Sequence, residues 1–198
     1  RESNLACMNA IGESWLKARF MFNFSSESFM NTFLSKMRGG TAVPPRAPFR
    51  HIALSWLGGF LAISAVALAT DISHMPLVLG SFGASCVLIF GFPESPFSQP
   101  RNVIVGHFLS SLSGLLFLTL FGPHWWSMAL AVGTAIAVMQ LTRTVHPPAG
   151  SNPVIVMQAA PAWSFLLTPT LIGSVIVVIV AIVFNNIPKD RSYPKYWM

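Results

Sequence analysis

Residues 146–153 form a polar, proline-rich segment that lies between two strongly apolar stretches of the chain. The segment reads His-Pro-Pro-Ala-Gly-Ser-Asn-Pro, and three prolines with one glycine cannot continue a helix. The flanking residues 129–141 and 154–160 are mostly apolar and are typical of membrane segments. Irregular backbone at membrane depth persists only where protein buries it or where it lines a water-filled cavity. This constraint makes residues 146–153 the first candidate for a functional site.

The composition indicates a membrane protein. Of the 198 residues, 53% are hydrophobic and only 9% are charged, whereas soluble domains carry about 25% charged residues. Several runs approach the roughly 20 apolar residues that cross a bilayer as a helix. The sequence therefore predicts an all-α, polytopic membrane protein, with an N-terminal extension over residues 1–43 and a transmembrane domain over residues 44–198.

The net charge of +6 is explained by membrane topology rather than by a nucleic-acid partner. The basic residues lie near the ends of the chain and in the expected loops, as the positive-inside rule requires. Cys7 and Cys86 make no disulfide framework, because Cys86 lies inside an apolar run.

The N-terminal extension carries apolar residues at helical spacing between positions 15 and 37, with lysines and arginines among them. This pattern favours an amphipathic helix, or a pair of helices, on the membrane surface. An ordinary helix that packs on the membrane domain is the alternative.

Four apolar spans are expected over residues 52–69, 77–92, 103–121 and 125–142. Residues 154–187 are too long for one upright span, but they can form two short ones with a turn near Thr168 and Pro169. Six spans would place all twelve lysines and arginines on one side of the membrane, with both termini in the cytoplasm. Five spans are the alternative, because residues 154–167 contain Gln158 and Pro161 and are compatible with a broken or re-entrant helix.

A parallel repeat of two helices and a proline-broken segment is also possible. An offset of 50 residues aligns three pairs of identical residues: His74 with His124, Gly83 with Gly133, and Asn102 with Asn152.

The two internal broken segments, residues 93–102 and 146–153, each end in an asparagine that precedes an apolar helix. Asparagine is a good helix N-cap, and helix N-termini attract anions. The candidate anion-binding residues are Arg101, Asn102, His107, His146, Ser151 and Asn152. The structural alternatives are that Arg101 anchors a helix end at the lipid headgroups, that His146 is a structural cap, and that the asparagines only cap helices.

No enzymatic site is expected. The five histidines are not at metal-ligand spacing, and no carboxylate lies inside a span. The chain has no Gly-x-Ser-x-Gly, His-Glu-x-x-His or phosphate-binding glycine-rich motif. Ser151 has His146 nearby in sequence but no carboxylate to orient it. The sequence predicts no catalytic residue, no metal and no cofactor.

The two broken segments, together with Gly106 and His107, resemble the HPP family of integral membrane proteins. The resemblance covers residues 36–197. Its structural motif residues are Pro96, Gln99, Pro100, Pro147, Pro148, Gly150 and Pro153. The family occurs in bacteria and in the chloroplast envelope of plants and algae, and it is commonly described with four spans. The resemblance implies a bacterial inner (plasma) membrane, or alternatively the chloroplast envelope.

Plant and cyanobacterial members of this family are implicated in nitrite transport. The leading hypothesis is therefore a passive or proton-linked transporter or channel for a small inorganic anion, most readily nitrite, in which His146 or His107 carries any coupled proton. The expected partners are the anion, the lipid bilayer and further copies of the chain, because the helices are rich in small residues. The alternative function is a membrane scaffold or sensor that acts through the N-terminal extension.

Overall fold

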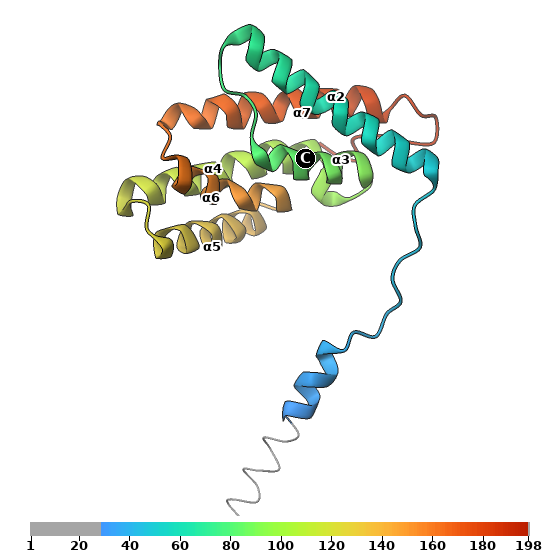
Figure 1. Ribbon diagram of the computed structural model, residues 1–198, viewed down its shortest axis with the longest axis horizontal. Helices are drawn as coiled ribbons and strands as arrows, with labels where there is room; N and C mark the ends of the chain where they lie inside the picture. Colours follow the sequence, from blue (N-terminus) through green and yellow to red (C-terminus); the bar gives the residue numbers. More distant parts are fainter. Residues whose placement is uncertain (1–28, 198) are drawn as a thin grey trace, which may run out of the picture. The chain divides into compact units, whose positions relative to one another are not determined.

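The computed structural model describes residues 29–197, and its regular structure is entirely helical (Figure 1). The contacts divide the chain into two units, Arg1–Arg46 and Ala47–Met198. In the first unit, residues 29–37 are helical, and the rings of Phe29 and Phe33 stack with centroids 6.3 Å apart. The rest of the expected amphipathic region, residues 15–28, lies outside the described residues.

The second unit contains six α-helices, and successive helices run in alternating directions (Figure 1). The helices are α2 (Phe49–Ser73), α3 (Gly80–Gly91), α4 (Pro100–Phe121), α5 (Trp125–Leu141), α6 (Asn152–Ala159) and α7 (Ile172–Asn185). Short 3-10 turns, η1 (Pro96–Ser98), η2 (Pro147–Ser151) and η3 (Trp163–Leu166), and a π-helical turn, η4 (Leu167–Leu171), connect them. Helix α2 packs against α3 and α7, and α4 packs against α5 and α6.

Within residues 29–197, three helical stretches are long and apolar enough to cross a membrane. They are Phe49–Ser73, Pro100–Phe121 and Trp163–Asn185, and the shorter apolar helices are α3 and α5. The chain reverses after α2 at His74 (φ 56°) and after α4 at Gly122 (φ 77°), where glycine meets the positive φ without strain.

The expected fifth span, residues 154–167, is not one continuous helix. Helix α6 has 8 residues and ends at Ala159, and the C-cap residue Ala160 has a left-handed φ of 42°. Eight residues rise about 12 Å, less than half of the roughly 30 Å hydrocarbon core. The broken-helix alternative describes this segment, and the six-span count stays a prediction.

The proposed repeat is not confirmed. In both broken segments a 3-10 turn leads into a helix with proline in its first turn, Pro100 in α4 and Pro153 in α6. However, α4 has 22 residues and α6 has 8. Asn102 is the third residue of α4, whereas Asn152 is the first residue of α6, so the two segments also differ in register.

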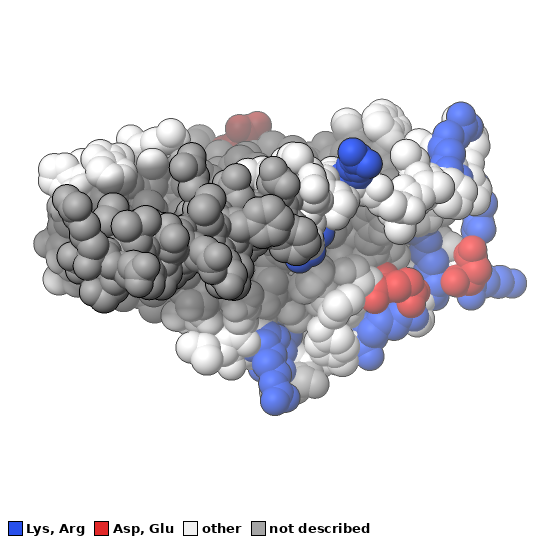
Figure 2. Space-filling view, turned by 90° about the horizontal axis from the view of Figure 1, so that it is seen from below, with Lys and Arg blue, Asp and Glu red and all other residues white. Residues whose placement is uncertain are grey.

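The basic residues of the second unit lie at one end of its helices, as the sequence predicted. Arg50 in the first turn of α2 pairs with Asp190, which follows α7, at 2.8 Å. Arg101 at the start of α4 donates to the carbonyl of Thr142, which follows α5, at 3.0 Å. In Figure 2, several lysine and arginine side chains lie beside acidic ones at one end of the face in view.

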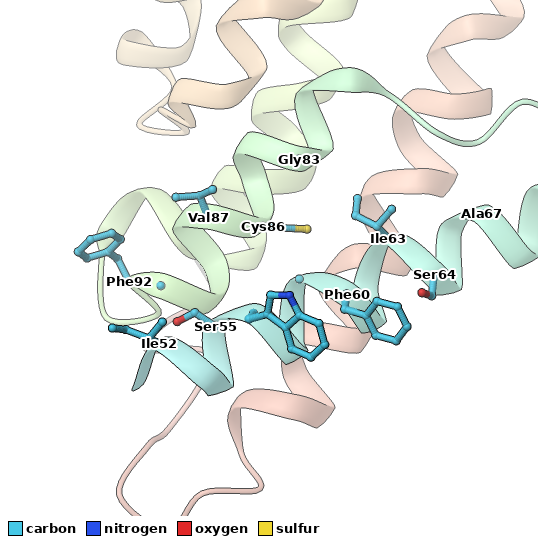
Figure 3. A pocket seen from close by; sticks show the side chains of 13 residues that line it. Ile52, Ser55, Phe60, Ile63, Ser64, Ala67, Gly83, Cys86, Val87 and Phe92 are labelled. Atoms are coloured by element: carbon cyan, nitrogen blue, oxygen red, sulfur yellow. The ribbon is translucent and has the colours of Figure 1, made fainter. Parts of the chain in front are cut away.

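An apolar groove of about 830 Å³ lies between α2 and α3 (Figure 3). The rings of Trp56 and Phe60 stack on its α2 side with centroids 5.8 Å apart, and Gly83 and Cys86 lie on its α3 side. None of the residues that line this groove is charged. The groove therefore offers no counter-charge to an anion, and the polar residues of the domain must be sought elsewhere.

Candidate functional site

Four polar side chains from four separate segments meet in the interior of the second unit. Ser85 comes from α3, His107 from α4, His146 from the segment before η2, and Asn152 from the first position of α6. Each has an exposed fraction of 0%. We call these four residues the histidine cluster. A buried polar group in an apolar helical domain is costly unless it is hydrogen-bonded, so their partners decide what the cluster can do.

The hydroxyl of Ser85 joins the two imidazoles. Its Oγ atom lies 2.9 Å from Nε2 of His107 and 2.8 Å from Nε2 of His146. The two rings face each other edge to face, with centroids 5.0 Å apart. The phenyl ring of Phe82 lies against His107 with centroids 5.1 Å apart, so an apolar side chain covers part of the pair.

The direction of each hydrogen bond follows from one backbone carbonyl. Nδ1 of His146 lies 2.7 Å from the carbonyl oxygen of Phe97, which can only accept, so Nδ1 carries a hydrogen. In the neutral ring Nε2 then accepts, and the Ser85 hydroxyl donates to it. Because Ser85 has a single hydrogen, its oxygen accepts from Nε2 of His107. Nδ1 of His107 in turn accepts from the Asn152 amide at 3.0 Å.

The hydroxyl of Ser85 has a second acceptor within reach. Its Oγ atom lies 3.1 Å from the carbonyl oxygen of Ser81, one helical turn earlier in α3. Ser85 can therefore donate either to His146 or to its own helix, and a small rotation of one side chain changes which acceptor is used.

Close contacts between α4 and residues 144–149 hold His146 in place. A Cβ atom on Gly106 would lie 2.9 Å from Cβ of His146 and 2.9 Å from the carbonyl oxygen of Thr144, so only glycine fits at this position. Nearby, Ser110 donates to the carbonyl of Ala149 at 2.6 Å. The Gly106-His107 pair noted in the sequence is thus the point where α4 meets the His146 segment.

Among the described residues, the side chain of Asn152 makes hydrogen bonds only through its amide nitrogen, Nδ2. Besides His107 Nδ1, Nδ2 lies 2.9 Å from Oγ of Ser111 and 3.3 Å from the carbonyl oxygen of His107. Thr170 donates to the same Ser111 oxygen at 3.0 Å. The Asn152 oxygen, Oδ1, is buried and has no hydrogen-bond partner among the described residues.

The C-terminal tail braces the 93–102 segment from outside. The buried hydroxyl of Tyr193 donates to the carbonyl of Ser98 at 2.7 Å, and the backbone N–H of Lys195 donates to Oε1 of Gln99 at 2.7 Å. The side-chain amide nitrogen of Gln99 donates hydrogen bonds to the carbonyls of Pro93 and Ser95. Since Phe97 orients His146, the tail supports the cluster indirectly.

A Tyr193→Phe variant is expected to lose about 1–3 kcal/mol of unfolding free energy, because the buried Ser98 carbonyl is left without its donor. Burial raises the pKa of Tyr193, so the neutral, hydrogen-bonded form persists in the folded protein above the usual value of about 10. Wild type should therefore lose stability as pH rises above about 10, and the variant should show less of this loss. Thermal unfolding in detergent measures both effects. Tyr196→Phe, at a more exposed tyrosine, is the matched control, and equal losses in the two variants would contradict the prediction.

The structure brings three of the six predicted site residues together: His107, His146 and Asn152. Asn102 lies nearby, and it donates to the carbonyl of Val145, next to His146, at 2.9 Å. Arg101 instead donates from its guanidinium to the carbonyl of Thr142 at the C-terminal end of α5. A cation is favourable there because the helix dipole places partial negative charge at that end. Ser151 is exposed and donates to the carbonyl of Pro148 at 2.9 Å.

The expectation that both asparagines cap helices is wrong. The N-cap residues are Gln99 for α4 and Ser151 for α6, and neither uses its side chain as a cap. Asn102 and Asn152 lie inside the helices, and their amides point to distant parts of the chain. Long-range hydrogen bonds therefore replace the local interaction that the motif suggested.

Sequence reasoning missed Ser85 as the partner of both histidines. It also missed Ser111, which accepts from Asn152, and Thr170, which donates to Ser111. One pattern could have revealed the α4 face: Ser110 and Ser111 lie three and four residues after His107, and Gly114 lies four and three residues after them. Such a polar and small face inside an apolar span indicates close contact with other helices. Gly114 bears this out, since a Cβ there would lie 2.9 Å from Cα of Pro153.

All four residues of the histidine cluster lie in the part of the chain that matches a known protein family. The family described as HPP, transmembrane region, matches residues 44–194. Two transmembrane proteins of Dictyostelium discoideum are similar to the chain. One is 40% identical over 167 residues, which is 78% of this chain and 58% of that protein. The other is 36% identical over 177 residues, which is 83% of this chain and 57% of that protein. The chain thus spans less than two thirds of each relative, and no solved structure matches it.

Proposed function

The chain belongs to the HPP transmembrane family, and we propose that it transports a small inorganic anion together with a proton, with nitrite as the first substrate to test. It is an integral membrane protein. The observation that carries the proposal is the histidine cluster, in which one serine hydroxyl links two buried imidazoles.

The two imidazoles and Ser85 have two protonation states in which each of their hydrogens has an acceptor. In the neutral state Ser85 donates to His146 Nε2. When His146 gains a proton, Nε2 becomes a donor to Ser85 Oγ, and the Ser85 hydroxyl turns to the Ser81 carbonyl. The Phe97 carbonyl accepts from Nδ1 in both states. A site that exchanges protons needs this property, because neither state leaves a hydrogen of the imidazoles or of Ser85 without an acceptor.

A purely structural role gives a poorer account of the same residues. Replacing both partners of a buried hydrogen bond by apolar groups of the same shape can be nearly neutral for stability, and ionisable groups inside membrane domains usually mark a pathway for ions or protons. Histidine is the side chain whose charge changes most readily near neutral pH. Two histidines joined by one hydroxyl are therefore a suitable proton carrier.

An anion suits this carrier on electrostatic grounds. A proton on His146 creates a buried positive charge, and an anion that moves with it keeps the pair neutral, which lowers the cost of crossing an apolar domain. Arg143 lies three residues before His146, and Arg101 donates to the carbonyl of the neighbouring Thr142, so both cations raise the local anion concentration at this end of the helices.

Reconstituted vesicles test the proposal. With the outside more acidic than the lumen, vesicles that contain the protein should accumulate nitrite faster than protein-free vesicles of the same lipid. A protonophore, which collapses the pH gradient, should abolish the accumulation. Uptake equal to that of protein-free vesicles would refute transport, and carrier-dependent uptake that ignores the protonophore would refute the proton coupling.

A further inference from the structure

We infer that Asn152 Oδ1 marks a buried binding site for a small ligand with an O–H or N–H group, so that a weak-acid substrate is bound there in its neutral, protonated form. The inference rests on the proposed transport function and specifies which chemical form of the substrate the site recognises.

The orientation of the Asn152 amide is set by its surroundings. The carbonyl oxygen of His107 lies 3.3 Å from Nδ2 and can only accept a hydrogen bond. Turning the amide over would place Oδ1 against that carbonyl oxygen, with two acceptors facing each other. The amide nitrogen therefore stays on the His107 side, and Oδ1 is directed away from it.

Asn152 Oδ1 is then an acceptor that lacks a donor. It is fully buried and has no hydrogen-bond partner among residues 29–197. Leaving a buried carbonyl oxygen unpaired is unfavourable, so a ligand with a donor group gains from binding here. A bare anion has no hydrogen to give, and it would meet the negative end of the amide dipole.

No fixed positive charge adjoins this oxygen in the described structure. Asn152 bonds to His107 and Ser111 on α4, and Ser111 accepts from Thr170 of η4. The titratable groups that face this region are His107 directly and, through Ser85, His146. Arg101 is held at the end of α5 by the Thr142 carbonyl. An isolated anion would thus be desolvated without a cation to offset it.

A second unpartnered polar atom adjoins the cluster. The Oγ atom of Ser81, one turn before Ser85 on α3, is buried and has no hydrogen-bond partner in the described part of the chain. A hydroxyl can accept from a ligand or donate to it. Because the carbonyl of Ser81 accepts from Ser85, which bonds to both imidazoles, we take the Ser81 hydroxyl as the second contact in the inferred site.

The neutral form also connects the site to the proton carrier. A weak acid that binds at Asn152 brings its own proton next to His107. Loss of that proton leaves the anion, and the proton moves to an imidazole of the histidine cluster, so charge and hydrogen are both accounted for. The substrate and the coupled proton thus arrive as one molecule.

A substrate series in wild-type vesicles tests the inference without any substitution. Nitrite and formate, whose conjugate acids are weak, should both be carried. Nitrate, whose conjugate acid is strong, should not be carried above the rate of protein-free vesicles. Two nitrite solutions of different pH, adjusted to the same concentration of nitrous acid, should give equal carrier-dependent rates.

Two substitutions test the contacts. Asn152→Leu should reduce carrier-dependent uptake to background. Ser81→Ala, which removes an unpartnered hydroxyl, should leave thermal stability unchanged or higher yet lower uptake roughly 2- to 10-fold, the value of one hydrogen bond. Ser113→Ala, at a buried serine that donates to its own helix, is the control and should transport normally.

The outcomes separate the two proposals. If no anion is carried above background, the transport function itself is wrong. If nitrate is carried as fast as nitrite, or if rates follow total anion rather than the acid, transport stands and the inferred site is wrong. Wild-type uptake in Ser81→Ala would also overturn the Ser81 contact, even if Asn152→Leu fails to fold.

Discussion

A His146→Gln variant is expected to lose proton-driven nitrite accumulation completely while it keeps the fold. Glutamine can donate to the Phe97 carbonyl and accept from Ser85, so both contacts of the neutral imidazole are reproduced. An amide does not take up a proton at physiological pH, so the second protonation state of the cluster is lost. The measurement is nitrite uptake into vesicles under an imposed pH gradient.

The control is His124→Gln. His124 is exposed, precedes α5 and stacks on Trp126 with ring centroids 5.8 Å apart, well apart in the chain from the cluster. This variant should accumulate nitrite at the wild-type rate. Thermal unfolding should show both variants folded. Wild-type accumulation by a folded His146→Gln protein would mean that the cluster does not carry the coupled proton.

A Gly106→Ala variant is expected to lose about 1–3 kcal/mol of unfolding free energy, the usual cost of an extra methyl group in a close-packed interior. The new Cβ would lie 2.9 Å from both the Thr144 carbonyl oxygen and Cβ of His146. Because one of these atoms belongs to the backbone, the segment must move as a whole. The movement pulls His146 away from Ser85, so nitrite uptake should fall together with stability.

Gly133→Ala is the matched control for this loss. Gly133 lies in α5, and nothing would come within 4 Å of a Cβ added there. Alanine favours a helix over glycine by up to about 1 kcal/mol, so this variant should be as stable as wild type or more stable. A Gly106→Ala protein with wild-type stability and uptake would show that α4 and residues 144–146 are not in tight contact.

The sequence alone was sufficient for the properties that depend on composition and on local patterns. Low charge and long apolar runs predicted a helical membrane protein, and the two proline-broken segments were correctly identified as interruptions between α-helices. The segments are not free of helix, because each contains a 3-10 turn and ends in the first turn of α4 or α6. The gathering of basic residues at one end also followed from the sequence, since their positions between apolar runs are enough to determine it. The resemblance to the HPP family was confirmed over residues 44–194.

Other features could not be predicted because they depend on contacts between distant residues. Ser85 reads as one small residue in an apolar helix, and its role appears only because α3 brings it to His146, 61 residues away. Asn152 looked like a helix cap, but its amide reaches His107 and Ser111 on α4. Arg101 looked like an anion ligand, but its guanidinium donates to the carbonyl of Thr142 at the C-terminal end of α5.

Residues 146–153 show most clearly which properties the local sequence determines and which ones depend on the tertiary structure. By itself the sequence of residues 146–153 determined that the backbone breaks there and must be buried or solvated, because prolines remove helical donors. Only the tertiary structure decided that most of it is buried, with Pro147 and Ser151 exposed and His146 held between the Phe97 carbonyl and Ser85. The physical reason is that local dihedral preferences are encoded in neighbouring residues, whereas hydrogen-bond partners depend on which helices pack together.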